Sequence, residues 1–104
     1  MQEITPTALQ ERLSRAPAPI VLDVREPWEQ AIARLAGTLD IPMSEVPARL
    51  AELPKDRDIV VMCKAGGRSA MVAQYLEQRG YRVANLTGGI LRWAKDVDPT
   101  LATY

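Results

Sequence analysis

Short apolar runs and longer amphipathic segments alternate along this chain. The runs at 20–25 and 58–62 are rich in Ile and Val, which is typical of strands buried on both faces of a sheet. Runs at 39–42 and 81–86 predict two further strands, and residues 4–6 are expected to form a short extended entry. Helical segments separate the strands, so the strands are expected to be parallel neighbours joined by crossovers. The pattern therefore predicts an α/β fold whose parallel sheet carries helices on both faces.

Apolar residues at helical spacing fill the segments between the predicted strands. The predicted helices begin after Thr5, span 27–35, 44–53 and 69–79, and begin again after Gly89. Thr5 and Ser44 are the expected N-caps of the first and third helices, and Gly80 is the expected C-terminal stop of the fourth. Three of the predicted helices thus have a residue suited to one of their ends.

Four large side chains are expected to pack inward from these helices. Leu9 and Leu13 lie four residues apart and are expected to form the buried stripe of the first helix. Trp28 and Trp93 are isolated tryptophans at helical spacing, for which packing is a commoner role than ligand binding.

The composition is that of one small domain. The chain has 104 residues, of which 47% are hydrophobic, which is enough for one modest core and too little for two domains. We expect a domain over 1–104, with its core at about 3–95 and a C-terminal tail at 96–104. Thirteen basic side chains balance thirteen acidic ones, so no general attraction to nucleic acid or to an anionic membrane is expected.

The amino-terminal sequence and the cysteine content favour a cytoplasmic location. Residues 1–4 lack the basic and apolar regions of a signal peptide, and no apolar run reaches membrane-spanning length. A single cysteine cannot form an intramolecular disulfide, which agrees with a reducing compartment.

That cysteine, Cys63, stands between the strand at 58–62 and the start of a helix, where unpaired amides favour an anion. Gly66 and Gly67 lack a Cβ and allow the backbone to curl into a nest of inward-pointing amides. Lys64 and Arg68 add two positive charges. We therefore expect a partly exposed, nucleophilic thiolate. The alternative, a buried structural cysteine, is commoner for a lone cysteine but does not account for these neighbours.

The carboxyl ends of the other strands are expected to reach the same crevice. Asp23 and Arg25 end the strand at 20–25, and Thr87 and Gly88 follow the last strand. We expect a structural role for Asp23, accepting hydrogen bonds that position a neighbouring loop.

Missing residues exclude several kinds of cysteine chemistry. The chain has no histidine, so a Cys-His protease pair and a Cys/His zinc site are unsupported. It has no second cysteine, so dithiol redox cycling is unsupported as well. We expect neither a metal nor any other cofactor.

Four segments in the same order resemble the rhodanese family, and together they cover nearly the whole chain. They lie at 23–29, 37–42, 63–69 and 86–93. The resemblance implies a single rhodanese-like domain with a central, mostly parallel five-stranded sheet. It also implies that sulfur is carried as a persulfide on a catalytic cysteine, here Cys63.

The resemblance further implies a loop that binds the substrate and stabilises the persulfide. Its residues are Lys64, Ala65, Gly66, Gly67, Arg68 and Ser69, with Asp23 and Arg25 in support. One segment departs from the family pattern, because Arg34 and Ala36 stand where active members often have His and Pro. We interpret that segment as framework.

The residues agree with a sulfurtransferase that takes sulfane sulfur from thiosulfate or a persulfide donor. Cys63 would pass it to a thiophilic acceptor, which could be cyanide, a thiol or a protein. Sulfite leaves as a stable anion, so the reaction needs no histidine acid, and Lys64 and Arg68 would attract the sulfonate end of the donor. The expected partners are therefore a small sulfur donor and a possible protein donor or acceptor.

Three other functions remain open from the residues. A cysteine phosphatase also uses a cysteine, glycines and an arginine, but only four residues separate Cys63 from Arg68, a short ring better suited to one sulfur atom. Arsenate reduction would need an external thiol to resolve the oxidised cysteine. A noncatalytic rhodanese-like binding or regulatory module typically lacks the cysteine that this chain keeps.

Overall fold

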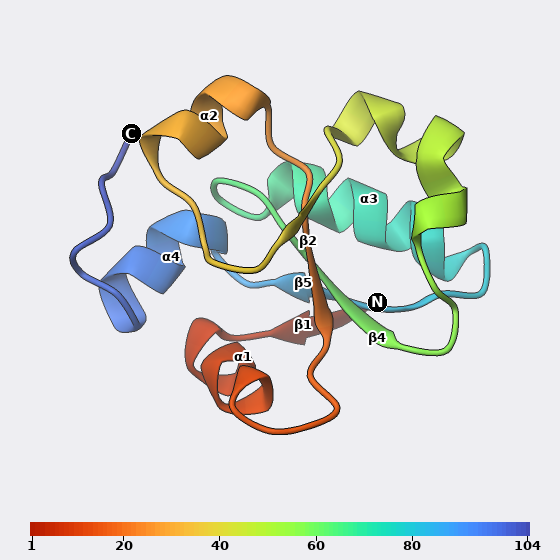
Figure 1. The fold of residues 1–104 in the computed structure, drawn as a ribbon, viewed down its shortest axis with the longest axis horizontal. Helices are drawn as coiled ribbons and strands as arrows, with labels where there is room; N and C mark the ends of the chain where they lie inside the picture. The colour runs from red at the N-terminus through yellow and green to blue at the C-terminus, as the bar shows by residue number, and fades with distance from the viewer.

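The computed structural model describes all 104 residues, and its centre is a sheet of five parallel strands in the order β1-β5-β4-β2-β3 (Figure 1). The strands are β1 (Gln2–Ile4), β2 (Ile20–Asp23), β3 (Leu39–Asp40), β4 (Asp58–Met62) and β5 (Arg82–Leu86). β4, the apolar run that precedes the cysteine, occupies the middle of the sheet. The predicted α/β class and the parallel sheet are confirmed.

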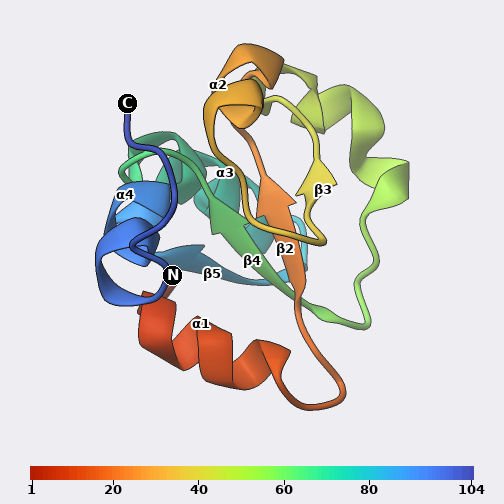
Figure 2. The same cartoon turned by 60° about the vertical axis from the view of Figure 1, so that its left-hand side comes forward.

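Helices cover both faces of the sheet, as predicted (Figures 1 and 2). The helical elements are α1 (Pro6–Leu13), α2 (Pro27–Ile32), η1 (Met43–Glu52), α3 (Gly67–Glu77) and α4 (Gly89–Asp96). α1 and α4 pack on one face, and α3 and η1 pack on the other. α2 lies beyond the tips of the strand arrows, beside the C-terminal end of the chain (Figure 2).

Side chains that alternate along β4 build the two cores, because successive residues of a strand point to opposite faces. Ile59 and Val61 belong to the cluster beneath α3 and η1. Val60 and Met62 belong to the cluster beneath α1 and α4. β4 therefore holds both layers together and delivers the next residue, Cys63, to the carboxyl end of the sheet.

The start of α1 and the end of α3 are set by residues close to them in the sequence, as predicted. Thr5 caps α1 as predicted, because its hydroxyl oxygen accepts a hydrogen bond from the amide of Ala8 at 3.3 Å. Gly80, at φ +89°, ends the turn after α3, where the amide of Tyr81 donates to the carbonyl of Leu76 at 3.2 Å.

The predicted helix at 44–53 is instead a 3₁₀ helix, η1, which follows Pro42 and is broken at Arg49. Ser44 is therefore not its N-cap. Pro47 lies inside the segment and lacks the amide that a continuous α-helix would use.

Two predicted packing residues are exposed. Leu13 is 37% exposed, because α1 ends at this residue and buries only Pro6 and Leu9. Trp28 is 63% exposed, because α2 ends at Ile32 and turns Glu29, rather than the tryptophan, toward the protein. Trp93, by contrast, is partly buried against the cluster beneath α1 and α4, as expected.

The predicted tail at 96–104 returns to the body of the domain (Figure 1). Leu101 and Tyr104 pack against the cluster beneath α1 and α4. Tyr104 also reaches α2, where its hydroxyl donates to Glu29 at 2.6 Å. The last residues of the chain therefore lie beside the segment that follows β2.

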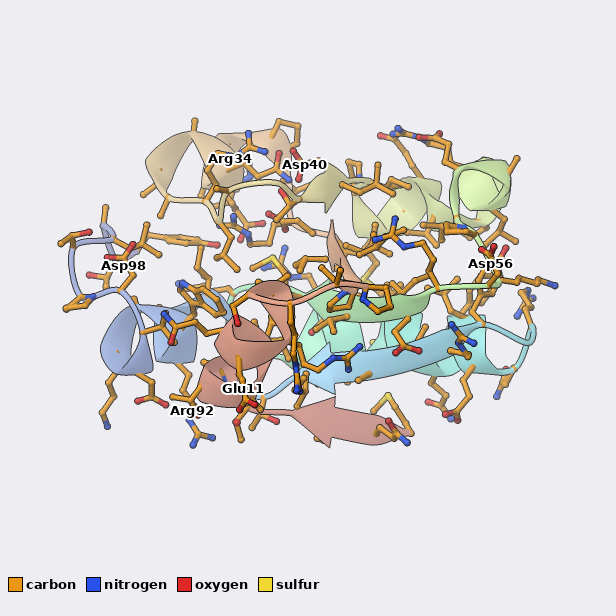
Figure 3. All side chains as sticks on the ribbon, turned by 60° about the horizontal axis from the view of Figure 1, so that its bottom comes forward. Glu11, Arg34, Asp40, Asp56, Arg92 and Asp98 are labelled. Atoms are coloured by element: carbon orange, nitrogen blue, oxygen red, sulfur yellow. The ribbon has the colours of Figure 1, made fainter.

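The two residues that depart from the family pattern lie at the surface, whereas Leu35 between them is buried. Arg34 is exposed and pairs with Asp40 at 2.6 Å, so the two side chains meet across the turn before β3 (Figure 3). Ala36 is exposed as well.

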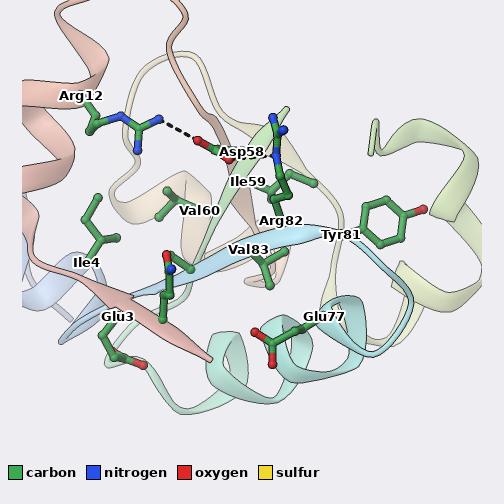
Figure 4. Close-up of a pocket in the computed structure, with 12 residues that line it drawn as sticks. Glu3, Ile4, Arg12, Asp58, Ile59, Val60, Glu77, Tyr81, Arg82 and Val83 are labelled. Atoms are coloured by element: carbon green, nitrogen blue, oxygen red, sulfur yellow. Dashed lines mark hydrogen bonds and ion pairs between the residues drawn. The ribbon is translucent and has the colours of Figure 1, made fainter. Parts of the chain in front are cut away.

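A surface hollow of about 410 Å³ lies at the amino ends of β4 and β5. Arg12 and Asp58 face each other across it (Figure 4). Cys63 does not line this hollow. None of the helices combines the length and the apolar character that crossing a membrane requires.

Candidate active site

The loop that carries Cys63 begins at the last residue of β4 and ends at the first turn of α3. Gly66 precedes the helix at φ +106°, a left-handed conformation that favours glycine. Its carbonyl accepts hydrogen bonds from the amide of Ala70 at 3.1 Å and from Asn85 Nδ2 at 3.2 Å. These bonds fix the turn that brings the amino end of α3 against the cysteine.

Hydrogen-bonding groups of the loop surround Cys63 Sγ. The amides of Gly66 and Ser69 donate to the sulfur at 3.1 Å and 3.4 Å, and Ser69 Oγ lies 3.2 Å from it. The predicted cradle of backbone amides is therefore present. The expected partial exposure is wrong, because only 1% of Cys63 is exposed beneath this loop.

Opposing effects act on the pKa of Cys63. Burial raises the pKa of the thiol, whereas the Ser69 hydroxyl and the amides of Ser69, Gly66 and Ala65 lower it by donating to the sulfur. The hydrogen bonds prevail, and the pKa of Cys63 lies below its ordinary value. The loop thus favours the thiolate form, which is the nucleophilic form of cysteine.

Ser69 connects the sulfur to a polar chain that ends at β1. When the cysteine is a neutral thiol, the Ser69 hydroxyl donates to Asn85 Oδ1 at 2.5 Å, and Asn85 Nδ2 donates to Glu3 Oε2 at 3.1 Å. Ser69 has one hydroxyl proton and two neighbours that can accept it. The neutral thiol of Cys63 can donate to Ser69 Oγ, and the thiolate can accept the Ser69 proton. Neither Asn85 nor Glu3 was identified from the sequence.

The start of α4 holds the backbone of the same loop. The amide of Ile90 donates to the Cys63 carbonyl at 2.9 Å, and the amide of Leu91 donates to the Lys64 carbonyl at 3.1 Å. A Cβ on Gly89 would overlap both carbonyls, and Gly89 has φ +60°. The glycines after β5 therefore allow α4 to approach the loop, while Thr87 donates to Glu3 at 2.9 Å.

Arg68 points its guanidinium at Glu29 of α2. Its two terminal nitrogens donate to the two carboxylate oxygens at 2.6 Å and 2.8 Å. The hydrogen bonds from Arg68 lower the pKa of Glu29 to about 2, despite burial. From the sequence, Arg68 is expected to attract the sulfur donor, and Glu29 is not predicted as a site residue. In the structure Glu29 is the direct partner of Arg68.

A second buried ion pair lies behind the first. Asp23 accepts hydrogen bonds from the amide of Arg25 at 3.0 Å and from its guanidinium at 2.9 Å, and both side chains are fully buried. Arg25 also donates to the Tyr104 hydroxyl at 3.0 Å, and that hydroxyl donates to Glu29. Asp23 and Arg25 therefore support α2 and Glu29, and neither is hydrogen-bonded to the sulfur.

Lys64 is the remaining charged side chain of the loop. Its ammonium lies 4.5 Å from the centre of the Tyr104 ring, a cation–π arrangement, and no carboxylate pairs with it. The expected cationic loop thus contains one paired cation, Arg68, and one cation held by an aromatic ring.

The donor set around Cys63 fits an anionic sulfur better than a metal. Amides and a hydroxyl face the thiolate, and no group of three or more carboxylate or cysteine side chains is placed to hold a metal ion. The amides of Gly67 and Arg68, the first two of α3, donate to no acceptor in the chain. These two amides lie between Gly66 and Ser69 in the sequence, and the amides of Gly66 and Ser69 both contact the sulfur.

The comparisons with known proteins agree with this geometry. A sequence model described as the rhodanese-like domain matches residues 5–96. A protein of Allochromatium vinosum named "Sulfurtransferase" is 41% identical over 103 residues, which span 98% of this chain and 96% of that protein. A solved rhodanese-like domain protein of Staphylococcus aureus superposes with a TM-score of 0.87 at 31% identity, covering 100% of this chain and 99% of that one.

Related domains also form parts of larger sulfur-transfer proteins. The "Probable adenylyltransferase/sulfurtransferase MoeZ" of Mycobacterium tuberculosis is 38% identical over 104 residues, which span 97% of this chain and 26% of that protein.

Proposed function

This chain belongs to the rhodanese-like domain family, and from that premise we propose that it is a sulfurtransferase that carries sulfur as a persulfide on Cys63. The main observation in support of this proposal is the set of hydrogen-bond donors around the sulfur. The amides of Gly66 and Ser69 donate to a buried thiol with a lowered pKa. Such a site holds a negative sulfur without a metal or a second cysteine.

The first half-reaction loads the cysteine. The Cys63 thiolate attacks the outer, sulfane sulfur of thiosulfate or of a persulfide donor. A new S–S bond forms to Cys63 Sγ while the donor's S–S bond breaks, and its electron pair leaves with sulfite or with the donor thiolate. Because both leaving groups are stable anions, this step needs no general acid, in agreement with the absence of histidine from the chain.

The second half-reaction discharges the persulfide. The terminal sulfur is stabilised by the free amides of Gly67 and Arg68 at the start of α3, where partial positive charge favours an anion. A nucleophilic acceptor such as cyanide, a thiol or a cysteine of another protein attacks this sulfur, and the Cys63 thiolate is released. The kinship with domains of larger sulfur-transfer proteins supports a protein partner.

Intact-protein mass spectrometry tests the proposal. The protein is incubated with thiosulfate, or separately with an alkyl persulfide, beside Cys63→Ser as the matched control. A gain of one sulfur that is confined to the Cys63 protein and is removed by cyanide as thiocyanate is the expected result.

Absence of that gain with both donors, in a folded protein, would overturn the proposal. Hydrolysis of a phosphate ester by the unmodified chain would then favour a cysteine phosphatase. Specific binding of another protein without chemistry would favour a regulatory module.

A further inference from the structure

Glu29 is held in place from three directions. Arg68 donates to both of its oxygens, the Glu26 amide donates to Oε1 at 3.0 Å, and the Tyr104 hydroxyl donates to Oε2 at 2.6 Å. The side chain of Glu29 is only 3% exposed. Movement away from Arg68 would break these bonds and leave a buried carboxylate without partners.

The guanidinium of Arg68 is therefore already paired with Glu29 before a sulfur donor binds. A bidentate pair to a carboxylate uses the same parallel N–H groups with which arginine would clamp a sulfonate. With its pKa at about 2, Glu29 remains ionised throughout the neutral range and cancels the charge of Arg68.

The charge that remains beside Cys63 is small. Asp23 cancels Arg25, Glu29 cancels Arg68, and Lys64 is the one cation of the loop that no carboxylate pairs with. The Cys63 thiolate itself contributes a negative charge. An incoming thiosulfate dianion would add two more negative charges to a site with one uncompensated cation.

We propose that Glu29 determines donor specificity: by neutralising Arg68 it makes the site favour sulfane donors with a single negative charge over the thiosulfate dianion. The inference rests on the proposed sulfur transfer and names its donor class. The class includes alkyl persulfide anions and thiosulfonates. Glu29 acts through Arg68 and is not itself a catalytic residue.

Thiosulfate and methanethiosulfonate form a matched pair of probes. In each, Cys63 Sγ bonds to the sulfane sulfur, the bond from that sulfur to the oxidised sulfur breaks, and sulfite or methanesulfinate leaves with the electron pair. The two donors differ by one unit of charge. The ratio of their kcat/KM values, thiosulfate over methanethiosulfonate, therefore reports the electrostatics of the site.

Three variants test the inference on the full chain. Glu29→Gln should raise the ratio by about tenfold, because it uncovers the charge of Arg68. Arg68→Gln should lower the ratio, because it leaves Glu29 uncompensated. The double variant removes both charges and should bring the ratio, though not necessarily the rates, back toward the wild-type value.

A surface pair provides the matched control. Arg49 also forms a bidentate pair, through Nε and one terminal nitrogen, with Glu52 in η1 at 2.6 Å and 3.0 Å, on an exposed part of the chain. Glu52→Gln changes the net charge by the same unit and should leave the ratio unchanged.

A folded Glu29→Gln variant with an unchanged ratio would overturn the inference. It would also be overturned if the double variant lost thiosulfate activity as completely as Arg68→Gln, since Arg68 would then bind thiosulfate itself. Failure of both donors to load wild-type Cys63 would overturn the proposed sulfur transfer and this inference with it.

A measurement on the wild-type protein covers the case in which Glu29→Gln fails to fold. Added salt weakens attraction between opposite charges. The inference expects kcat/KM for thiosulfate to fall no more steeply with salt than kcat/KM for methanethiosulfonate. A steeper fall for the dianion would show that a strongly cationic site attracts it, and would contradict the role given to Glu29.

Discussion

Arginine–carboxylate pairs occur at both ends of the sheet, but their surroundings differ. At the amino ends of β4 and β5, Asp58 pairs with Arg12 at 3.0 Å and with Arg82 at 3.1 Å beside an open hollow. All three side chains are exposed to water for a third or more of their surface. At the carboxyl end, Asp23 and Arg25 are fully buried, and Glu29 is nearly so.

The difference shows that burial, rather than residue type, makes an ion pair a constraint. An exposed pair is already solvated and contributes little when formed. A buried pair cannot lose one partner without leaving an uncompensated charge in a poorly solvated place. The carboxyl end of the sheet is therefore fixed by its ion pairs, whereas the hollow at the amino end carries ion pairs that can be removed at small cost.

The largest effect is expected at the fully buried pair. Arg25→Met fills a similar volume but leaves Asp23 buried without its cation, and it should lower the free energy of unfolding by about 3–5 kcal/mol. Urea denaturation measures the loss. A change below about 1 kcal/mol would place this pair with the exposed ones.

Acid should weaken the carboxyl end through Glu29. Its pKa is about 2 in the folded protein against an ordinary value of 4.5, so its stabilisation is fully present above pH 4.5 and is lost as the pH falls toward 2. The loss attributable to this group amounts to roughly 3 kcal/mol. Denaturation curves over that range, compared with Glu29→Gln, should show a shallower decline in the variant. Parallel declines in the two proteins would contradict the assignment.

Substitution of two glycines by alanine compares the two ends of the sheet without any change of charge. Gly89→Ala would place a Cβ against the Cys63 and Lys64 carbonyls at a positive φ, and should cost about 2–3 kcal/mol and slow sulfur loading. Gly80→Ala, before β5 at φ +89°, meets only the end of Lys55 at 3.9 Å and should cost about 1 kcal/mol. Thermal unfolding of both variants measures the difference, and equal losses would show that the α4 contact is not tight.

Ser69 should affect reactivity more than stability. Ser69→Ala removes the hydroxyl that lowers the pKa of Cys63, so the thiolate should form at higher pH. Alkylation by iodoacetamide at a pH below the Cys63 transition should slow by about tenfold, as expected for loss of one hydrogen bond to a charged group. Ser44→Ala, on exposed η1, is the control. An unchanged pH profile would assign the lowered pKa to the backbone amides alone.

The smallest effect is expected at the hollow. Arg12→Gln removes one of the two cations bound to Asp58 and should change the free energy of unfolding by less than about 1 kcal/mol. Salt should make the difference smaller still. A loss as large as that of Arg25→Met would remove the distinction between the two ends.

Local patterns along the chain predicted the elements whose signals are local. The apolar run of β4, the Thr5 cap and the Gly80 stop all act within a few residues, and the structure places them as expected. The cradle around Cys63 belongs to the same category, because Gly66 and Ser69 lie within six residues of the sulfur.

The site residues that were not predicted are placed by contacts with residues far away in the sequence. Glu29 pairs with Arg68, 39 positions away, and with Tyr104, 75 positions away, so its helix alone could not indicate that it is buried. One signal was present, because Glu29 closes the segment at 23–29 that carries the family resemblance. Asn85 gave no comparable signal, since it lies among the apolar residues of β5 and its partner Ser69 comes from another element.

The exposure of Trp28 shows that hydrophobic periodicity does not predict the buried face of a very short helix. With six residues, α2 makes fewer than two turns, and the spacing of its apolar side chains does not define a single face. The buried carboxylate of Glu29 instead decides which side of α2 faces the protein.

The depth of Cys63 gives the proposed cycle a physical on–off character. The bare thiolate is buried, so only a small group of a donor can reach it. In a persulfide the outer sulfur lies about 2 Å beyond Sγ, the length of one S–S bond. Loading would therefore place the reactive atom one S–S bond farther from the cysteine. In the proposed cycle the unloaded cysteine would stay buried, and the protein would present a transferable sulfur to an acceptor only after loading.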